Sequence, residues 1–135
     1  IVVILTTSTS PNPRDWRAIT LSSFTSLSLD PHPLITFNVK TPSACATAMH
    51  ARNRFIVHAM LPTTRAADFA ARFSLPYVPG QDWKYAVRPN SVEQPLAYIH
   101  LDNLPALWEE VMFRLYCTPE RTIPVQDHEI WVAKI

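Results

Sequence analysis

Glycine is almost absent from this sequence, which contains one glycine, Gly80, against 13 prolines in 135 residues. The Gly-rich loops that bind phosphate in dinucleotide-binding and P-loop folds need at least two glycines at fixed spacing. Both of these fold classes are therefore excluded.

Cysteine, net charge and long apolar runs are also scarce. Cys45 and Cys117 have no CxxC spacing, so they are expected to be reduced, buried, small apolar residues and not zinc ligands. Twelve Lys and Arg against 11 Asp and Glu give a net charge of +1, which argues against a protein that binds nucleic acid directly. Apolar runs such as 1–5 are far shorter than the ~20 residues that cross a bilayer, so we expect no membrane span.

The remaining composition is that of one folded domain. With 47% hydrophobic and 17% charged residues, the chain can bury a core. It opens with Ile1 rather than Met and closes with another apolar stretch, so we expect a single domain over 1–135 that is incomplete at both ends. The sequence favours an intracellular protein but does not choose between cytoplasm and mitochondrion.

The pattern of apolar residues predicts mostly strands. Thr6–Arg17 reads as a loop, and Leu75–Gln94 as a long excursion. Ser43 and either Thr63 or Thr64 are expected to cap two helices, the second with an apolar stripe at helical spacing. We therefore predict a mainly β, antiparallel barrel with helical insertions. The expected strands are Ile1–Leu5, Ala18–Ser23, Phe24–Leu29, Leu34–Val39, Phe55–Met60, Leu96–Leu101, Leu107–Cys117 (ambiguous with helix) and Glu129–Ile135.

The densest polar stretch is a candidate ligand site. Residues 20–28 hold six hydroxyl side chains, and hydroxyls with backbone N–H groups can hold a planar polar ligand or a phosphate. The alternative is the wet face of an edge strand.

Two further candidates stand near predicted element ends. Lys40, Ser43 and the first N–H groups of a helix could bind a phosphate, or could be a helix cap beside a solvated lysine. His128, between Asp127 and Glu129, could act as an acid, lie beside a hydride-transfer site or be an ion-pair partner. The histidines lack HxH and HExxH spacing, so we expect no metal site.

These stretches, in this order, resemble the flavin reductase-like family, which has the FMN-binding split β-barrel fold. Its first strand ends in Thr-Thr, as in Thr6-Thr7 here. Its most specific segment, Gly-Met-Thr-x-Ser-Ser-Phe-x-Ser-x-Ser-Leu, corresponds to residues 18–29. Its Arg-Phe-x-Val-x-x-Leu, Ala-x-x-Phe and late Asp-His-x-x-x-x-Gly motifs correspond to residues 54–61, 70–73 and 127–133.

The resemblance implies a homodimer that binds FMN, or FAD, near the subunit interface and transfers hydride from NAD(P)H to the flavin. It places His128 on the nicotinamide side as the catalytic candidate. It also implies a partner monooxygenase, or a larger assembly, that receives reduced flavin. The implied cofactor-binding residues are Thr20, Leu21, Ser22, Ser23 and Phe24 around the ring, with Asn38, Lys40 and Ser43 toward the ribityl chain and phosphate.

The sequence also departs from the family pattern. Ala18 and Ala133 stand where the family has glycine, and Ser43-Ala44-Cys45 replaces the usual Ser-x-Thr. A Cβ can obstruct a site where backbone must approach a ligand. A second hypothesis is therefore a non-catalytic family member that serves as a structural or interaction subunit of a larger complex.

Overall fold

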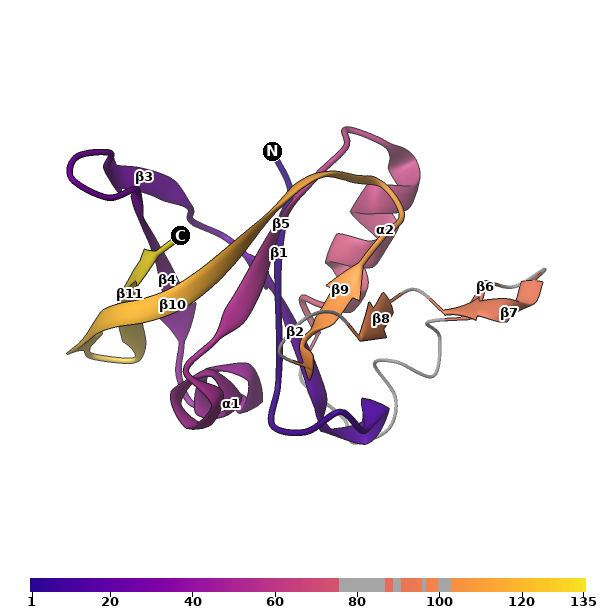
Figure 1. Cartoon of the computed structure of the whole chain (residues 1–135), viewed down its shortest axis with the longest axis horizontal. Helices are drawn as coiled ribbons and strands as arrows, with labels where there is room; N and C mark the ends of the chain where they lie inside the picture. The colour runs from indigo at the N-terminus through magenta and orange to yellow at the C-terminus, as the bar shows by residue number, and fades with distance from the viewer. Residues whose placement is uncertain (76–86, 89–90, 96, 100–102) are drawn as a thin grey trace.

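One long strand, β10, joins the two halves of a seven-stranded antiparallel sheet with the order β2-β1-β5-β10-β11-β4-β3. The first part of β10 pairs with β5, and the rest pairs with β11. Figure 1 shows this strand crossing the molecule from the β11 side to the α2 side. The prediction of a mainly β, antiparallel split barrel with helical insertions is confirmed.

The structure is a computed structural model, and it describes residues 1–75, 87–88, 91–95, 97–99 and 103–135. The elements in chain order are β1 (Val3–Ser8), a 3-10 turn η1 (Pro13–Asp15), β2 (Trp16–Leu21), β3 (Thr25–Ser28), β4 (Leu34–Lys40), α1 (Ala44–Arg52), β5 (Phe55–Met60), α2 (Thr64–Arg72), β6 (Val87–Arg88), β7 (Ser91–Pro95), β8 (Ala97–Ile99), β9 (Pro105–Leu107), β10 (Val111–Val125) and β11 (His128–Lys134).

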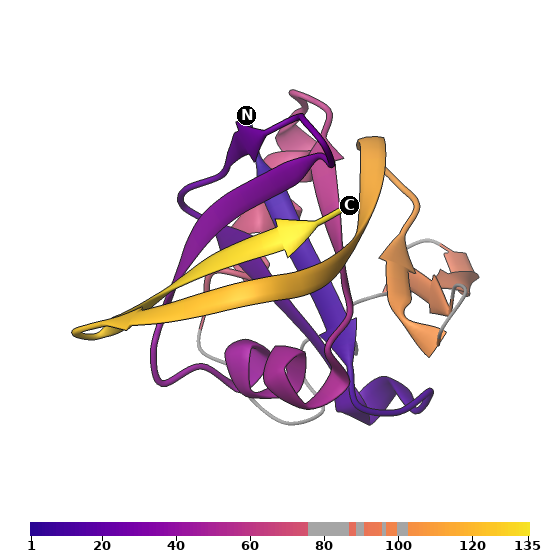
Figure 2. The ribbon, with the colours of Figure 1, turned by 60° about the vertical axis from the view of Figure 1, so that its left-hand side comes forward.

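The main core lies inside the barrel, and α1 packs against one end of it (Figures 1 and 2). Phe37 stacks parallel to Trp131 at 6.3 Å between ring centroids and meets Phe55 edge-on at 5.6 Å. Burial of such large apolar side chains is the dominant favourable contribution to folding. The core therefore joins β4, β11 and β5, which come from both halves of the sheet.

A second apolar cluster holds α2 against the sheet. Ala66, Phe69 and Phe73 are buried and pack with Ile4 and Met60. This is the stripe that the sequence predicts for the second helix. Thr63 begins the helix, since its hydroxyl accepts a hydrogen bond from the Ala66 N–H at 3.1 Å.

The first strand spans Val3–Ser8 instead of the predicted Ile1–Leu5, because it continues through three hydroxyl residues that we assigned to a loop. Thr6, Thr7 and Ser8 are buried, and each donates its hydroxyl to a backbone carbonyl: Pro105 at 2.5 Å, Arg54 at 2.8 Å and Asn103 at 2.8 Å, respectively. Buried polar groups are tolerated when they are paired in this way. These partners are distant in sequence, so local sequence gives no sign of them.

Other boundaries also differ from the prediction. The ambiguous segment 107–117 is extended: β9 ends at Leu107, Glu110 has a positive φ of 60°, and β10 begins at Val111. Residues 87–88 and 91–95 form an antiparallel pair inside the expected excursion. The rest of that excursion, 76–86 and 89–90, lies outside the described residues, as do positions 96 and 100–101 of the strand expected over 96–101.

Candidate functional site

The ends of β4 and β11 bring together residues that are far apart in the chain. Lys40 lies directly opposite His128, and Asn38 lies opposite Ile130 in the same antiparallel register. Opposite residues of antiparallel strands point to the same face. The alternate positions Val39 and Trp131 are buried, so the other face is the exposed one.

We call this exposed surface the outer face. Its apolar part comes from β10 and β11, because Ile123 pairs with Ile130, and Val125 pairs with His128. Ile123 is 38% exposed and Val125 is 46% exposed. The outer face thus has an apolar strip beside a polar strip. Its residues are Thr36, Asn38, Lys40, Ile123, Val125, His128, Ile130 and Val132.

The hydroxyl-bearing segment 20–24 is divided between the end of β2 and the connection to β3. The Thr20 hydroxyl donates to the Ala70 carbonyl at 2.6 Å, and the Thr20 N–H donates to the Phe73 carbonyl at 3.1 Å. Leu21 is buried in the main core, and Phe24 packs against it. This part of the segment therefore attaches β2 to the end of α2 and to the core.

Ser22 and Ser23 follow β2 and do not belong to the main core. Ser22 is exposed, and the Ser23 hydroxyl accepts a hydrogen bond from the Asn38 N–H at 2.9 Å. This bond places Ser23 beside β4, two residues before Lys40. Four of the predicted residues, Ser23, Asn38, Lys40 and His128, therefore lie on or beside the paired strands β4 and β11.

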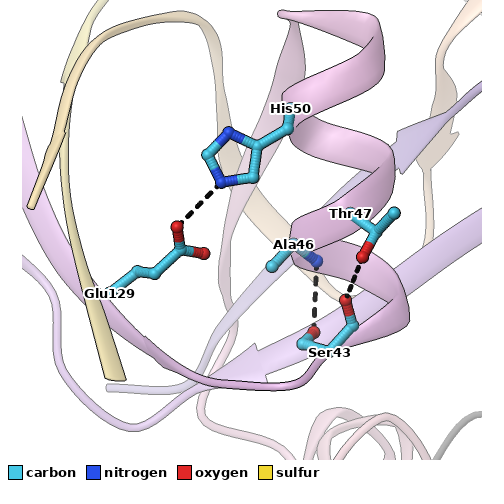
Figure 3. A network of polar contacts seen from close by, with 5 residues as sticks. All are labelled: Ser43, Ala46, Thr47, His50 and Glu129. Carbon is cyan, nitrogen blue, oxygen red and sulfur yellow. Dashed lines mark hydrogen bonds and ion pairs between the residues drawn. The ribbon is translucent and has the colours of Figure 1, made fainter. Parts of the chain in front are cut away.

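The turn at 41–43 leads from β4 into α1. The Ser43 hydroxyl accepts a hydrogen bond from the Ala46 N–H at 3.1 Å, and Thr47 donates its hydroxyl to the Ser43 carbonyl at 3.0 Å (Figure 3). Ser43 is thus the helix cap that the sequence predicts. The positive end of the helix dipole at this turn favours an anion.

A cavity of about 550 Å³ opens between this turn, β2 and the end of α2. We call it the β2–α1 cavity. Lys40 and Ser43 line it, whereas β2 contributes Ala18 and Ile19 instead of the hydroxyl residues that follow them. Its volume falls in the range of small-molecule and cofactor sites. The other lining residues are Thr41, Pro42, Ala44, Cys45, Phe73, Ser74 and Leu75.

A second cavity, of about 280 Å³, lies on the other side of the same turn, and we call it the β11–α1 cavity. His128 and Glu129 line it from β11, and Ser43, Thr47 and His50 line it from the α1 side. Because residues 41–43 line both cavities, the turn separates two adjoining hollows.

The sequence analysis missed the pair formed by His50 and Glu129. Figure 3 shows His50 pointing from α1 toward Glu129 on β11, and its Nε2 lies 2.8 Å from the carboxylate. The His50 ring also lies 4.6 Å from the ring of Trp131, between centroids. The two residues are 79 positions apart, and His50 stands alone in an Ala-rich helix, so no sequence pattern indicates the pair.

Burial makes the two thiols poor nucleophiles. It raises the pKa of Cys45 to about 12, with a small opposing effect of the Arg17 charge, and it raises the pKa of Cys117 to about 12. Thiolate is the reactive form of cysteine. Cys45 therefore contributes shape rather than chemistry to the β2–α1 cavity. Both residues are free and buried, as predicted.

The two alanines that replace family glycines lie in different surroundings. Ala18 lines the β2–α1 cavity, so its methyl group takes up space that a glycine would leave to a ligand. Ala133 is fully buried in the main core, opposite Ile35, and therefore faces away from the outer face. Of these two alanines, only Ala18 lines a cavity of the described residues.

No helix in the described part of the chain is both long enough and apolar enough to cross a membrane. Those same residues contain no group of three or more His, Cys, Asp or Glu side chains that could hold a metal ion.

Solved structures with this architecture include several flavin reductases. The styrene monooxygenase flavin reductase of Pseudomonas putida S12 is 26% identical, with a TM-score of 0.72 over 98% of this chain and 74% of that one. The NADH:FAD oxidoreductase SgcE6 of Streptomyces globisporus is 23% identical, with a TM-score of 0.76 over 98% of this chain and 70% of that one. That protein has also been solved in complex with NAD and FAD fragments.

A longer protein shares the fold as well. A structure from Sinorhizobium meliloti 1021, described as an oxidoreductase, is 24% identical with a TM-score of 0.73. The match covers 99% of this chain but only 41% of that protein. Residues 1–135 also match the family described as "Flavin reductase like domain" along their entire length. The chain therefore belongs to the flavin reductase-like domain family.

Proposed function

We propose that this protein binds FMN, or FAD, and transfers hydride from NAD(P)H to the flavin. The observation that carries the proposal is the β2–α1 cavity, where Lys40, Ser43 and the start of α1 provide a cation, a turn and a helix dipole for a phosphate group. Family membership supports the same ligand. The residues around the cavity fit a flavin phosphate by charge and by size.

The protein's part in this reaction is to bind and orient. A bound flavin would supply the redox chemistry by accepting a hydride from the nicotinamide, while the chain holds the two rings in register. Ser22, Ser23 and Asn38 would border the ring, and Lys40 and Ser43 would contact the ribityl phosphate. Thr20, Leu21 and Phe24 would act mainly by shaping the wall, because they are bound to α2 or packed into the core.

We further propose that a second copy of the chain covers the outer face. The apolar strip made by Ile123, Val125, Ile130 and Val132 is only partly covered in the single chain. Burial of such a strip against a second copy removes apolar surface from water. The resulting homodimer would place a flavin beside Asn38 and Lys40 near the subunit interface. Reduced flavin would then pass to a partner monooxygenase.

The absorption spectrum tests the proposed function. Purified protein supplied with FMN or FAD should keep the flavin bands through gel filtration, and NADH or NADPH should bleach them under anaerobic conditions. Ser74→Trp fills the β2–α1 cavity and should abolish flavin uptake. Ser26→Trp, at an exposed position of the edge strand β3, is the matched control and should bind flavin normally. Ser23→Trp reports whether the ring reaches the outer face.

One specific observation favours the non-catalytic alternative. The hydroxyls of Thr20, Ser23 and Ser43 already have hydrogen-bond partners inside the protein, and the Ala18 methyl group narrows the cavity. A protein that stays colourless in excess FMN and FAD would support a structural subunit of a larger complex. Uptake of either flavin, with bleaching by a nicotinamide, would contradict it.

A further inference from the structure

A third cavity, of about 190 Å³, lies at the far end of α1 from the 41–43 turn, and we call it the β10–α1 cavity. The nine residues of α1 span about 14 Å, so the length of the helix separates this cavity from the turn. Among the described residues, it shares no lining residue with the β2–α1 cavity. The β10–α1 cavity therefore lies outside the proposed flavin site.

The β10–α1 cavity lies where a β-bulge in β10 faces the end of α1. Between Pro119 and Arg121 the register with β11 shifts by one residue, so Glu120 is an extra residue that has no partner on β11. Opposite this bulge, α1 ends at Asn53, which has the left-handed conformation with a φ of 59°. The bulged strand and the helix end supply most of the cavity wall.

The wall of this cavity contains a buried hydrogen-bond donor. Trp131 lines the cavity and is fully buried, and its indole N–H has no hydrogen-bond partner among the described residues. Its ring stacks on Phe37 and meets Phe55 edge-on in the main core. These two phenylalanines carry no acceptor nitrogen or oxygen, so an acceptor for the indole has to come from the cavity. Native proteins pair nearly all of their buried donors, which makes this N–H a sign of a bound acceptor.

Other polar side chains surround the same space. Thr122 lies opposite Trp131 in the strand register and is half-buried, so its hydroxyl is on the same face as the indole. Asn53, Glu120 and Arg121 are exposed and line the rim. The cavity thus combines a buried donor with groups that both donate and accept, which is the pattern of a site that orients a small polar molecule.

The charges around the cavity favour a neutral ligand. Glu120 and Arg121 carry opposite charges, and the His50 ring that lines the cavity is paired with Glu129 at 2.8 Å (Figure 3). The end of α1 adds the negative end of the helix dipole, which disfavours an anion. The indole N–H of Trp131 only donates, so it cannot bind a cation. A neutral group that contains both a carbonyl and an N–H meets all of these conditions.

We propose that the β10–α1 cavity binds a small carboxamide. The carbonyl oxygen of the ligand accepts a hydrogen bond from the Trp131 indole N–H, and its amide nitrogen donates toward the end of α1, where carbonyl groups lack helical partners. At ~30 Å³ per water molecule, the cavity has the volume of about six waters, which suits an amide with a few carbon atoms. This inference does not depend on flavin binding.

The nitrogen-15 NMR resonance of the Trp131 indole N–H tests the proposal directly. The resonance is assigned through its contacts with the His50 ring and is absent in Trp131→Phe. Propionamide and propionate, which have nearly the same shape and differ in charge, are titrated into the wild type. We expect propionamide to shift this resonance until it saturates, with a dissociation constant on the order of 1 mM, and propionate to bind at least about tenfold more weakly.

A cavity-filling variant tests the location of the site. Thr122→Phe places a ring in the cavity and should weaken propionamide binding at least about tenfold. Thr25→Phe, the same substitution at an exposed position of β3 outside the cavity, is the matched control and should leave the affinity unchanged.

Three results would overturn the proposal. They are an indole resonance that propionamide does not shift, equal binding of propionate and propionamide, and undiminished binding in Thr122→Phe. The first two come from the wild type alone, so the proposal can be refuted even where Thr122→Phe does not fold.

Discussion

The buried histidine of β5 makes the stability of this protein sensitive to acid. His58 is fully buried, and its two ring nitrogens are both paired. Nδ1 lies 3.0 Å from the Ile4 carbonyl, and the Leu107 N–H donates to Nε2 at 3.0 Å. An acceptor on one side and a donor on the other fix a single neutral tautomer, with the proton on Nδ1. His58 thereby joins β5 to β1 and β9.

Protonation of this side chain would disrupt that arrangement. Burial lowers the pKa of His58 from 6.5 to about 3, the Arg114 charge lowers it further, and the bond to Ile4 partly opposes both. The unfolded chain takes up this proton below pH 6.5, whereas the folded protein takes it up only near pH 3. The free energy of unfolding therefore has its full value above pH 6.5 and falls as the pH drops from 6.5 toward 3. At ~1.4 kcal/mol per pH unit, the folded state at pH 5 is about 2 kcal/mol less stable than at pH 7.

Urea unfolding at pH 7 and pH 5 measures this loss. In the wild type we expect the midpoint to fall by about 1 M. His58→Gln is the comparison, because its amide can pair with the same two backbone groups but does not titrate. It should be less stable at pH 7 and should lose about 2 kcal/mol less than the wild type on acidification. Equal losses in both proteins would show that His58 does not cause the acid sensitivity.

Three further predictions follow from single contacts. Ser43→Ala removes the cap of α1 and should lower the free energy of unfolding, measured with urea, by about 1 kcal/mol. Ser43→Asn, which keeps a capping side chain, should retain most of that free energy. An unchanged urea midpoint in Ser43→Ala would contradict the capping role. Ala18→Gly removes a methyl group from the wall of the β2–α1 cavity and should tighten FMN binding, measured by a fluorescence titration. Unchanged or weaker binding would show that this methyl group does not obstruct the ligand. Val125→Lys places a charge in the apolar strip and should convert the proposed dimer to a monomer, as measured by light scattering. Leu29→Lys, at an exposed position after β3, is the control and should leave the dimer intact. A dimer that persists in both variants would place the interface elsewhere.

Features that depend on neighbouring residues could be predicted from the sequence. The cap at Ser43 and the start of α2 at Thr63 were predicted because a capping hydroxyl bonds an N–H only three residues ahead. The bounds of β5, Phe55–Met60, were predicted from a short segment that is apolar except for His58. The motifs of residues 18–29 and 127–128 also led to the family that the comparison of the entire chain confirmed.

Features that depend on distant partners could not be predicted in this way. The hydroxyls of Thr6 to Ser8 are buried in β1 because carbonyls 47 to 99 positions away accept their hydrogen bonds. The β2–α1 cavity takes Ala18 and Ile19 from β2, because Thr20 is bound to the end of α2.

The sequence by itself determined the class of fold, the starts of the helices and the family, because propensity, capping and motif spacing are properties of neighbouring residues. Only the tertiary structure decided which of the candidate residues meet. Lys40 and His128 are placed opposite each other by the register of β4 with β11, and His50 meets Glu129 by the packing of α1 against that strand. Such contacts between distant residues are set by the closure of the barrel around its core, and local preferences along the chain do not encode them.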